Sequence, residues 1–222
     1  MKTPIMLVGS LVLSLILFSP NLNAQTPGTK TGIFNRFSNI GSPQIPGTAT
    51  YDKTAKTYRI SGSGSNIWLG HDSCSFLSKK MKGDFILKTR VRFMGEGHEL
   101  HRKTGIMIRK SQASNSTVVC CTVHGDGLTS LQYRSKPGEE MKEIKFTISG
   151  PDVLQLEKKG NTYIMSVSHF GKTIEVKKIE NIDLGSALMA GLFICSHNSK
   201  YSEEVEFSNT KVIKSKQPLM TK

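Results

Sequence analysis

The stretch HGDGLTSLQYR, residues 124–134, brings together residue types that bind ligands or catalyse reactions. His124 can exchange a proton near neutral pH, Asp126 accepts hydrogen bonds, and Arg134 presents a planar guanidinium group to polar oxygens. The two glycines beside the aspartate are typical of a turn between strands. The stretch is therefore compatible with an active site, with the rim of a sugar-binding surface, or with a hairpin that happens to carry polar residues.

Alternation along the flanking strands predicts which of these side chains share a face. His124 falls on the less apolar face of the strand that precedes the turn, and Gln132 and Arg134 share one face of the strand that follows it. We therefore predict that these three residues line one polar surface near a rim. The structural alternative is that Asp126 accepts backbone hydrogen bonds within its own turn while His124 holds the loop in place.

Two more residues are candidates for ligand contact. Arg109, in HRKTGIMIR, could bind a carboxylate or sugar hydroxyls, and it could equally pair with an acidic residue of a neighbouring strand. Trp68, the single tryptophan, follows a segment rich in glycine and serine, and its ring would either stack on a sugar or belong to the core. The predicted ligand-binding set comprises hydrogen-bonding, charge-pairing and stacking residues: His124, Asp126, Gln132, Arg134, Arg109 and Trp68.

A second polar stretch, GEGHELH at residues 95–101, resembles a metal site only superficially. The zinc signature H-E-x-x-H places two histidines four residues apart on a helix, whereas His98 and His101 are three apart between strand-like runs. We expect a solvated loop there, with no metal and no cofactor. His197 closes a later strand and is a candidate for a position near the same rim as His124.

The sequence does not indicate a pair of catalytic carboxylates. Retaining glycosidases use two carboxyl groups about 5–5.5 Å apart, which on a strand must alternate outward. The nearest pattern, Glu203, Glu204 and Glu206, lies in a terminal strand beside lysines, and we interpret it as a solvated edge. We also find no order of serine, histidine and aspartate, and no activated cysteine, that favours catalysis, so we predict no catalytic residues.

Short strand-like runs and turns occupy most of the chain and must position these residues. Runs of 5 to 11 residues alternate with turns such as KPGE, SGPD, KKGN and HFGK. In residues 84–93 the apolar side chains fall on one face and the basic ones on the other, and Gly160-Asn161 predicts a tight hairpin. Because no stretch shows a helical period over three turns, we predict an all-β fold, a two-layer antiparallel sandwich or jelly roll.

The amino terminus predicts export. Lys2, the apolar run of residues 5–18 and the small residue Ala24 follow the layout of a secretory signal peptide. The apolar run is too short to span a bilayer of about 30 Å. We expect a signal peptide at 1–24, an extended arm or first edge strand at 25–40, one domain at 41–214 and a flexible tail at 215–222. The product would be periplasmic or extracellular, with no membrane span.

Charge and cysteine content narrow the list of partners. Without Lys2 the formal net charge falls from +13 to +12, because residues 1–24 hold no other charged side chain. Such a charge favours acidic partners, although the lysines are spread along the chain and fit a solvated surface. For an exported protein we expect no nucleic acid partner. Four cysteines, at 74, 120, 121 and 195, lack zinc spacing. Export would permit disulfides, and the alternative that we favour is buried free thiols.

Several stretches resemble a known family when they are taken in order. They are SGSGSNIWLGHD, KKMKGDFIL, HRKTGIMIR, VHGDGLTSLQYR, QLEKKGNTYIMSVSHFG and AGLFICSHN. They are similar to exported bacterial domains of unknown function with the concanavalin A-like lectin/glucanase jelly roll, which often stand ahead of a TolB-like propeller in proteins described as biopolymer transporters. The likeness covers residues 41–213 and implies a jelly roll whose concave sheet binds ligands. We expect no propeller in this chain, so the description of the longer relatives as transporters gives little reason to expect transport here.

The chain departs from that family at positions where the relatives carry aromatic residues. Cys74-Ser75 and Ser78 stand where relatives have a Phe-His pair and a further aromatic residue, and Ile106 stands where relatives often have tryptophan. Fewer aromatic faces mean fewer platforms for sugar rings. We predict a non-catalytic binding module for carbohydrate or another polar glycan-like ligand. The alternatives are a glycoside-processing enzyme of the same superfold and an envelope module that binds a protein partner.

Overall fold

The computed structural model describes residues 31–214. The predicted signal peptide at 1–24, the start of the predicted arm at 25–30 and the predicted tail at 215–222 lie outside the described residues. Fourteen strands follow one another within the described part. They are β1 (Arg36–Ile40), β2 (Thr48–Asp52), β3 (Thr57–Gly64), β4 (Cys74–Lys82), β5 (Phe85–Met94), β6 (Lys103–Arg109), β7 (Val118–His124), β8 (Thr129–Arg134), β9 (Lys142–Lys145), β10 (Val153–Lys159), β11 (Thr162–Ser168), β12 (Glu175–Ile179), β13 (Ala187–Cys195) and β14 (Asn198–Lys214).

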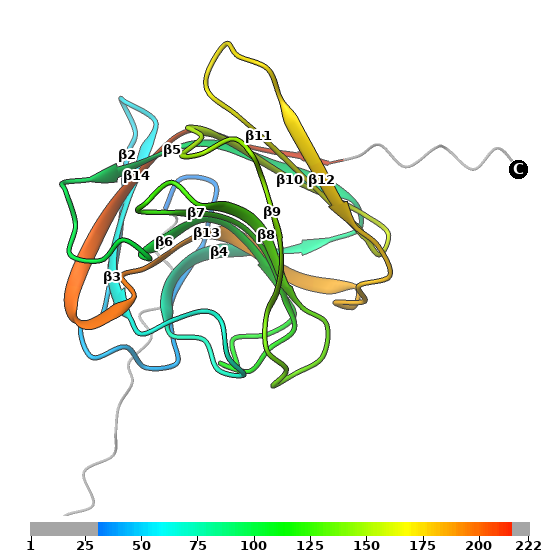
Figure 1. Cartoon of the computed structure of the whole chain (residues 1–222), viewed down its shortest axis with the longest axis horizontal. Coiled ribbons are helices and arrows are strands. Elements are labelled where there is room, and N and C mark those ends of the chain that lie inside the picture. The colour runs from blue at the N-terminus through cyan, green and yellow to red at the C-terminus, as the bar shows by residue number, and fades with distance from the viewer. Residues whose placement is uncertain (1–30, 215–222) are drawn as a thin grey trace, which may run out of the picture.

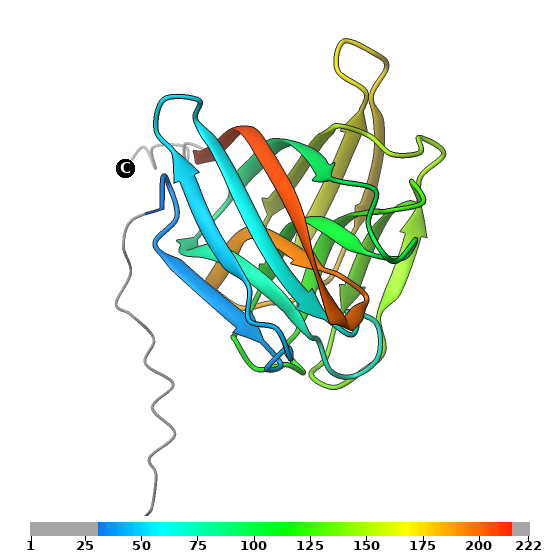
Figure 2. The same ribbon diagram turned by 90° about the vertical axis from the view of Figure 1, so that its left-hand side faces the viewer.

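The strands form two antiparallel seven-stranded sheets, which pack face to face as a sandwich (Figures 1 and 2). The first sheet has the order β1-β4-β13-β6-β7-β8-β9, and the second has the order β12-β11-β10-β5-β14-β3-β2. The predicted all-β, two-layer jelly roll is confirmed. Within residues 31–214 no helix is long and apolar enough to cross a membrane. The described part of the predicted arm includes β1, which pairs with β4 at one edge of the first sheet.

Local patterning accounts for these strands. In β5 every second side chain from Phe85 to Val91 is buried while Lys88 and Arg92 are exposed, as the alternation predicts. The hairpin predicted at Gly160-Asn161 joins β10 to β11, and Gly160 has a φ of 56°, which glycine adopts without strain. Terminal strand β14, by contrast, lies between β5 and β3 rather than at an edge.

The main core lies between the two sheets. Its side chains are large, apolar and almost completely shielded from water, which is the principal source of stability for such a sandwich. Members include Phe85, Leu87, Ile106, Ile108, Val119, Cys121, Leu131, Leu154, Leu156, Leu192, Val205 and Phe207.

A second apolar cluster lies on the outer face of the first sheet, the face turned away from the second sheet. It includes Phe76, Met107, Cys120 and Phe193, with Trp68 packed against it. Figure 1 shows this sheet curving over the loops at that side, so the outer face is concave and covered. Adjacent Cys120 and Cys121 point to opposite clusters, as predicted, and all four cysteines are buried and free.

Candidate functional site

The outer face of the first sheet carries four of the predicted ligand-binding residues. Val118 of β7 lies opposite Arg109 of β6 on one side and Arg134 of β8 on the other, and Gln132 lies opposite Cys120. His124, six residues beyond Val118 on the same strand, shares their face. The predicted shared face of His124, Gln132 and Arg134 is confirmed, and Arg109 lies on it as well. All four are buried, however, because loops cover this face.

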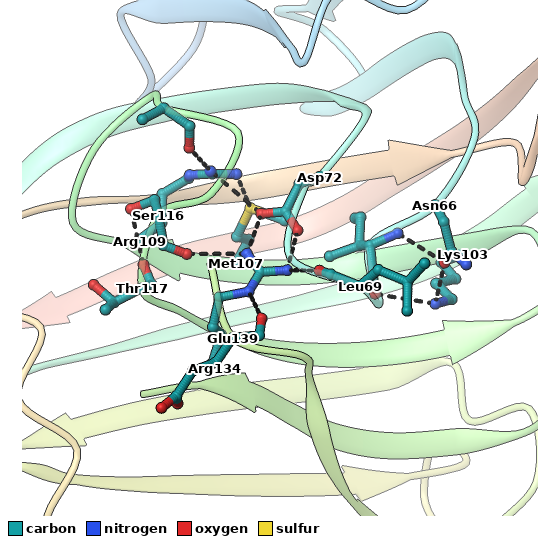
Figure 3. A network of polar contacts seen from close by, with 12 residues as sticks. Asn66, Leu69, Asp72, Lys103, Met107, Arg109, Ser116, Thr117, Arg134 and Glu139 are labelled. Atoms are coloured by element: carbon teal, nitrogen blue, oxygen red, sulfur yellow. Dashed lines mark hydrogen bonds and ion pairs between the residues drawn. The ribbon is translucent and has the colours of Figure 1, made fainter. Parts of the chain in front are cut away.

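At one end of this face Arg109 and Arg134 converge on Asp72, a residue of the loop before β4 (Figure 3). Arg134 makes a two-pronged contact, with its Nη2 2.8 Å from Oδ1 and its Nη1 3.1 Å from Oδ2, and Arg109 Nη2 lies 3.3 Å from Oδ2. None of the three side chains is exposed to solvent. Pairing of Arg109 with an acidic residue, one of its two expected roles, is therefore confirmed.

Backbone carbonyl groups accept from most of the remaining guanidinium donors, and Arg109 Nη1 donates to the Met107 sulfur at 3.6 Å. Arg109 donates to the carbonyl oxygens of residues 111 and 113 at 2.6 Å each. Arg134 donates to those of residues 116 and 139 at 3.1 and 2.6 Å, and also to that of Leu69. The cluster thus ties together three loops that cover the outer face, at residues 65–73, 110–117 and 135–141. Buried charges that are paired and fully hydrogen-bonded in this way avoid the cost of an isolated charge.

At the other end of the face a second group of side chains gathers around Lys103, and we call it the rim cluster: Trp68, His101, Lys103, His124 and His197. Lys103 is opposite His124 in the β6–β7 ladder. Its buried ammonium donates to Asn66 Oδ1 at 2.8 Å and to the carbonyl of residue 67 at 3.2 Å, and it lies 5.5 Å from the centre of the Trp68 ring. Burial lowers the pKa of Lys103.

Three histidine rings meet at this end. The ring of His101 lies 6.3 Å from that of His124 and 5.7 Å from that of His197, measured between centroids. Burial lowers the pKa of His124 to about 4, and it also lowers the pKa of His197. At neutral pH both rings are therefore neutral and able to accept or donate hydrogen bonds. His197 therefore lies at the same rim as His124, as predicted, with the ring of His101 between them.

The turn after β7 behaves as the structural alternative predicted. Asp126 Oδ1 accepts the backbone N–H of Leu128 at 2.9 Å, and His124 Nδ1 lies 2.9 Å from the Leu128 carbonyl oxygen. Asp126 Oδ2 also lies 3.8 Å from His101 Nδ1. Because the carbonyl engages Nδ1, the Nε2 atom of His124 is the nitrogen left for another partner.

Three buried polar atoms on the outer face have no hydrogen-bond partner within the described residues. They are Gln132 Oε1, Thr122 Oγ1 and Ser78 Oγ, and the residues are 1%, 0% and 0% exposed. Gln132 donates its amide to Ser130 Oγ at 3.0 Å, so only its acceptor is unused. An orphaned buried acceptor costs free energy and calls for an explanation such as a bound water or ligand.

The loop at residues 95–101 is tied to β14. Glu203 accepts the backbone N–H of His98 at 2.7 Å and pairs with Arg102 at 2.7 Å, while the ring of His98 stacks on Tyr201. Glu203 is buried, so its interpretation as a solvated edge is wrong: β14 is a central strand. Among residues 31–214, no three histidine, cysteine or acidic side chains are placed to hold a metal ion.

Sequence reasoning missed Asp72, His101 and Lys103. Lys103 could have been found by alternation, because it shares a face with Arg109 in the same strand. Asp72 had no local signal, since its partners are 37 and 62 residues away. His101 was noted only as part of a metal-like motif.

Comparisons with solved structures identify the fold. A functionally unknown protein from Saccharomyces cerevisiae matches with a TM-score of 0.60 and 14% identity, covering 82% of this chain and 97% of its own. A legume lectin-like domain from Entamoeba histolytica gives 0.56 and 10%, covering 81% and 90%. The carbohydrate-binding module CBM66 from Bacillus subtilis gives 0.51 and 13%, covering 82% and 97%. The chain therefore has the concanavalin A-like jelly-roll fold. A scan against protein-family models and a search of curated proteins each found no match.

Proposed function

We propose that this protein is a non-catalytic binding module for a carbohydrate or another polar glycan-like ligand, and that the ligand binds at the rim cluster. The observation that carries the proposal is the convergence of a half-buried indole, a buried ammonium and three histidine rings at one end of the concave face. An apolar ring beside a few convergent hydrogen-bonding groups is the usual composition of a small-ligand site.

Each side chain has a distinct part in the proposed site. Trp68 supplies the ring face on which a sugar would stack. His124 Nε2, Asp126 and the unused acceptor of Gln132 would hydrogen-bond hydroxyl groups. Lys103 would donate to a ring or hydroxyl oxygen after exchanging one of its loop contacts.

Arg109 and Arg134 support the site indirectly in this proposal. Their donors are occupied by Asp72 and by loop carbonyls, including that of Leu69, the residue after Trp68. They hold the loop that carries the indole, which reduces the entropy lost when a ligand binds.

The neighbouring structures are consistent with such a role, since two of them are a carbohydrate-binding module and a legume lectin-like domain. Shared fold does not carry function by itself, so the proposal depends on the rim cluster.

The glycoside-processing alternative has less support. A retaining enzyme needs two free carboxylates about 5–5.5 Å apart. On the outward positions of the described first-sheet strands Glu143 is the single carboxylate, and nearby Asp72 is held by two guanidinium groups. The envelope-module alternative predicts binding to a protein and no response to glycans. Export to the periplasm or beyond is also proposed, from the sequence of residues 1–24.

A glycan array followed by titration calorimetry on the best glycan tests the proposal. We expect Trp68→Ala to weaken binding by on the order of 10-fold or more, since one stacked or buried aromatic contributes about 1.5 kcal/mol or more. Phe170→Ala is the matched control, because it removes an exposed aromatic ring on a loop of the second sheet. Binding that survives in Trp68→Ala at wild-type strength, or an array with no hits, contradicts the proposal.

A further inference from the structure

The outer face of the second sheet, turned away from the core, takes no part in the proposed function. Register and burial place one row of polar side chains across it: Ser166 of β11, Gln155 of β10, Lys88 of β5 and Lys211 of β14. The neighbouring strand β12 adds Val176 at one end of this row. At about 4.8 Å between strands, the row is roughly 19 Å wide.

Two lysines in this row are directly opposite each other. Lys211 is the register partner of Lys88, both are exposed, and neither has an ion-pair partner within residues 31–214. Like charges opposite each other on neighbouring strands destabilise a sheet. Arg90, two residues along β5, adds a third positive charge, partly balanced by Asp152 at 2.7 Å. The repulsion between Lys88 and Lys211 therefore lowers the stability of the fold, and an anion bound over both ammonium groups would relieve it.

An apolar row runs alongside the lysines on the same face. In this row Ile213 of β14 lies opposite Ile86 of β5. Ile164 of β11 lies two strands further along, with Glu157 of β10 between it and Ile86. Ile213 is 50% exposed, and the other two isoleucines are half-buried. Isolated apolar side chains are common on surfaces, but a row beside unpaired lysines indicates contact with something both apolar and anionic.

The loop between β11 and β12, residues 169–174, extends this face. Figure 1 shows the loop projecting beyond the sandwich on the side away from the first sheet. Phe170 and Ile174 at this projection are 68% and 62% exposed, and Val176 at its base is 54% exposed. The projection also carries exposed Lys172. Large apolar side chains at the end of a projecting loop, next to a lysine, suit insertion among lipid headgroups.

We propose that this face attaches the protein to an anionic lipid surface. The lysines at 88, 172 and 211 contact lipid phosphates, and the side chains at 170, 174 and 176 enter the headgroup region. An acidic protein or a free polyanion would account for the lysines. It would leave Ile174 and Val176 exposed, and the Phe170 ring with the Arg90 guanidinium, 4.6 Å from its centroid, on one side. The rim cluster on the opposite sheet stays accessible in this orientation, so the attachment is independent of ligand binding there.

Flotation of the purified protein with lipid vesicles tests the proposal. We expect binding to vesicles of equal parts phosphatidylglycerol and phosphatidylcholine, weakening as salt is raised, and little binding to phosphatidylcholine alone. Lys88→Gln with Lys211→Gln should weaken partitioning on the order of 30-fold, because each lysine near an anionic surface contributes about a fivefold change. Phe170→Ser with Ile174→Ser should also weaken it, with less effect on the salt dependence.

Matched controls separate this surface from general charge. Lys80→Gln with Lys142→Gln removes two exposed lysines from the first sheet and should leave vesicle binding near wild type. Thermal unfolding checks folding, and Lys88→Gln should itself raise Tm by relieving the like-charge contact. The proposal is overturned if the wild-type protein fails to float with anionic vesicles, if both lysine pairs weaken binding equally, or if the Phe170/Ile174 variant binds like wild type.

Discussion

Replacing Asp72 by asparagine should be one of the most damaging conservative changes in this protein. The carboxylate is the shared partner of two guanidinium groups whose side chains, like its own, have no solvent exposure. Asparagine keeps the size but removes the negative charge, and its amide would present hydrogens to groups that are themselves donors. Two buried positive charges would then face each other with no negatively charged partner, leaving backbone carbonyls and the Met107 sulfur as acceptors.

The expected cost follows from the burial. Removing one partner of a buried ion pair typically costs 3–5 kcal/mol of unfolding free energy. Because five carbonyl oxygens still accept hydrogen bonds from the two guanidinium groups, we expect a cost in the middle of that range, about 4 kcal/mol. For a domain of this size that corresponds to a fall in Tm of about 8–16 °C. The measurement is urea unfolding followed by tryptophan fluorescence, because Trp68 is on one of the loops that the cluster holds.

A surface pair provides the comparison. Lys178 and Glu180 are 2.8 Å apart, but their side chains are 62% and 53% exposed. Glu180→Gln should cost under about 1 kcal/mol. If Asp72→Asn is no more destabilising than Glu180→Gln, the buried cluster does not hold the covering loops and the reasoning is refuted.

Three further predictions concern other parts of the fold. Gly105→Ala should be severely destabilising, because the added Cβ would lie 1.9 Å from the Cys121 carbonyl oxygen. Gly83→Ala should cost only about 1–2 kcal/mol, because no atom lies within 4 Å of its Cβ and only the positive φ is unfavourable. Comparing the urea unfolding midpoints of the two variants checks this. Burial lowers the pKa of His124 from 6.5 to about 4. The neutral ring therefore contributes stability above pH 6.5, and this contribution is lost as the pH falls toward 4, by at most about 3 kcal/mol. His124→Asn should flatten the dependence of the unfolding free energy on pH between 4 and 6.5. Burial raises the pKa of Cys120 to about 12 and that of Cys195 to about 11, so thiol reagents should label no cysteine in the folded protein and all four after unfolding; rapid labelling of the native protein would contradict this.

The sequence by itself determined the fold class and the faces of individual strands. Alternation in β5 and the turn at Gly160 are local properties, since the pleat repeats every two residues and a positive φ selects glycine. For the same reason the shared face of His124, Gln132 and Arg134 was predictable. The Asp126 turn was predictable too, because its hydrogen bond spans two residues.

Tertiary structure alone decided what covers those faces. Nothing near Arg109 or Arg134 in the chain indicates Asp72, because the partner arrives on a loop that packing brings across the sheet. The sequence pattern around Glu203 is typical of a solvated edge, but the order of the strands places β14 in the centre of its sheet and buries this side chain. Long-range pairing depends on how distant strands assemble, which the pattern of one strand does not encode. The same alternation therefore left open whether a polar face meets water, a loop or a ligand.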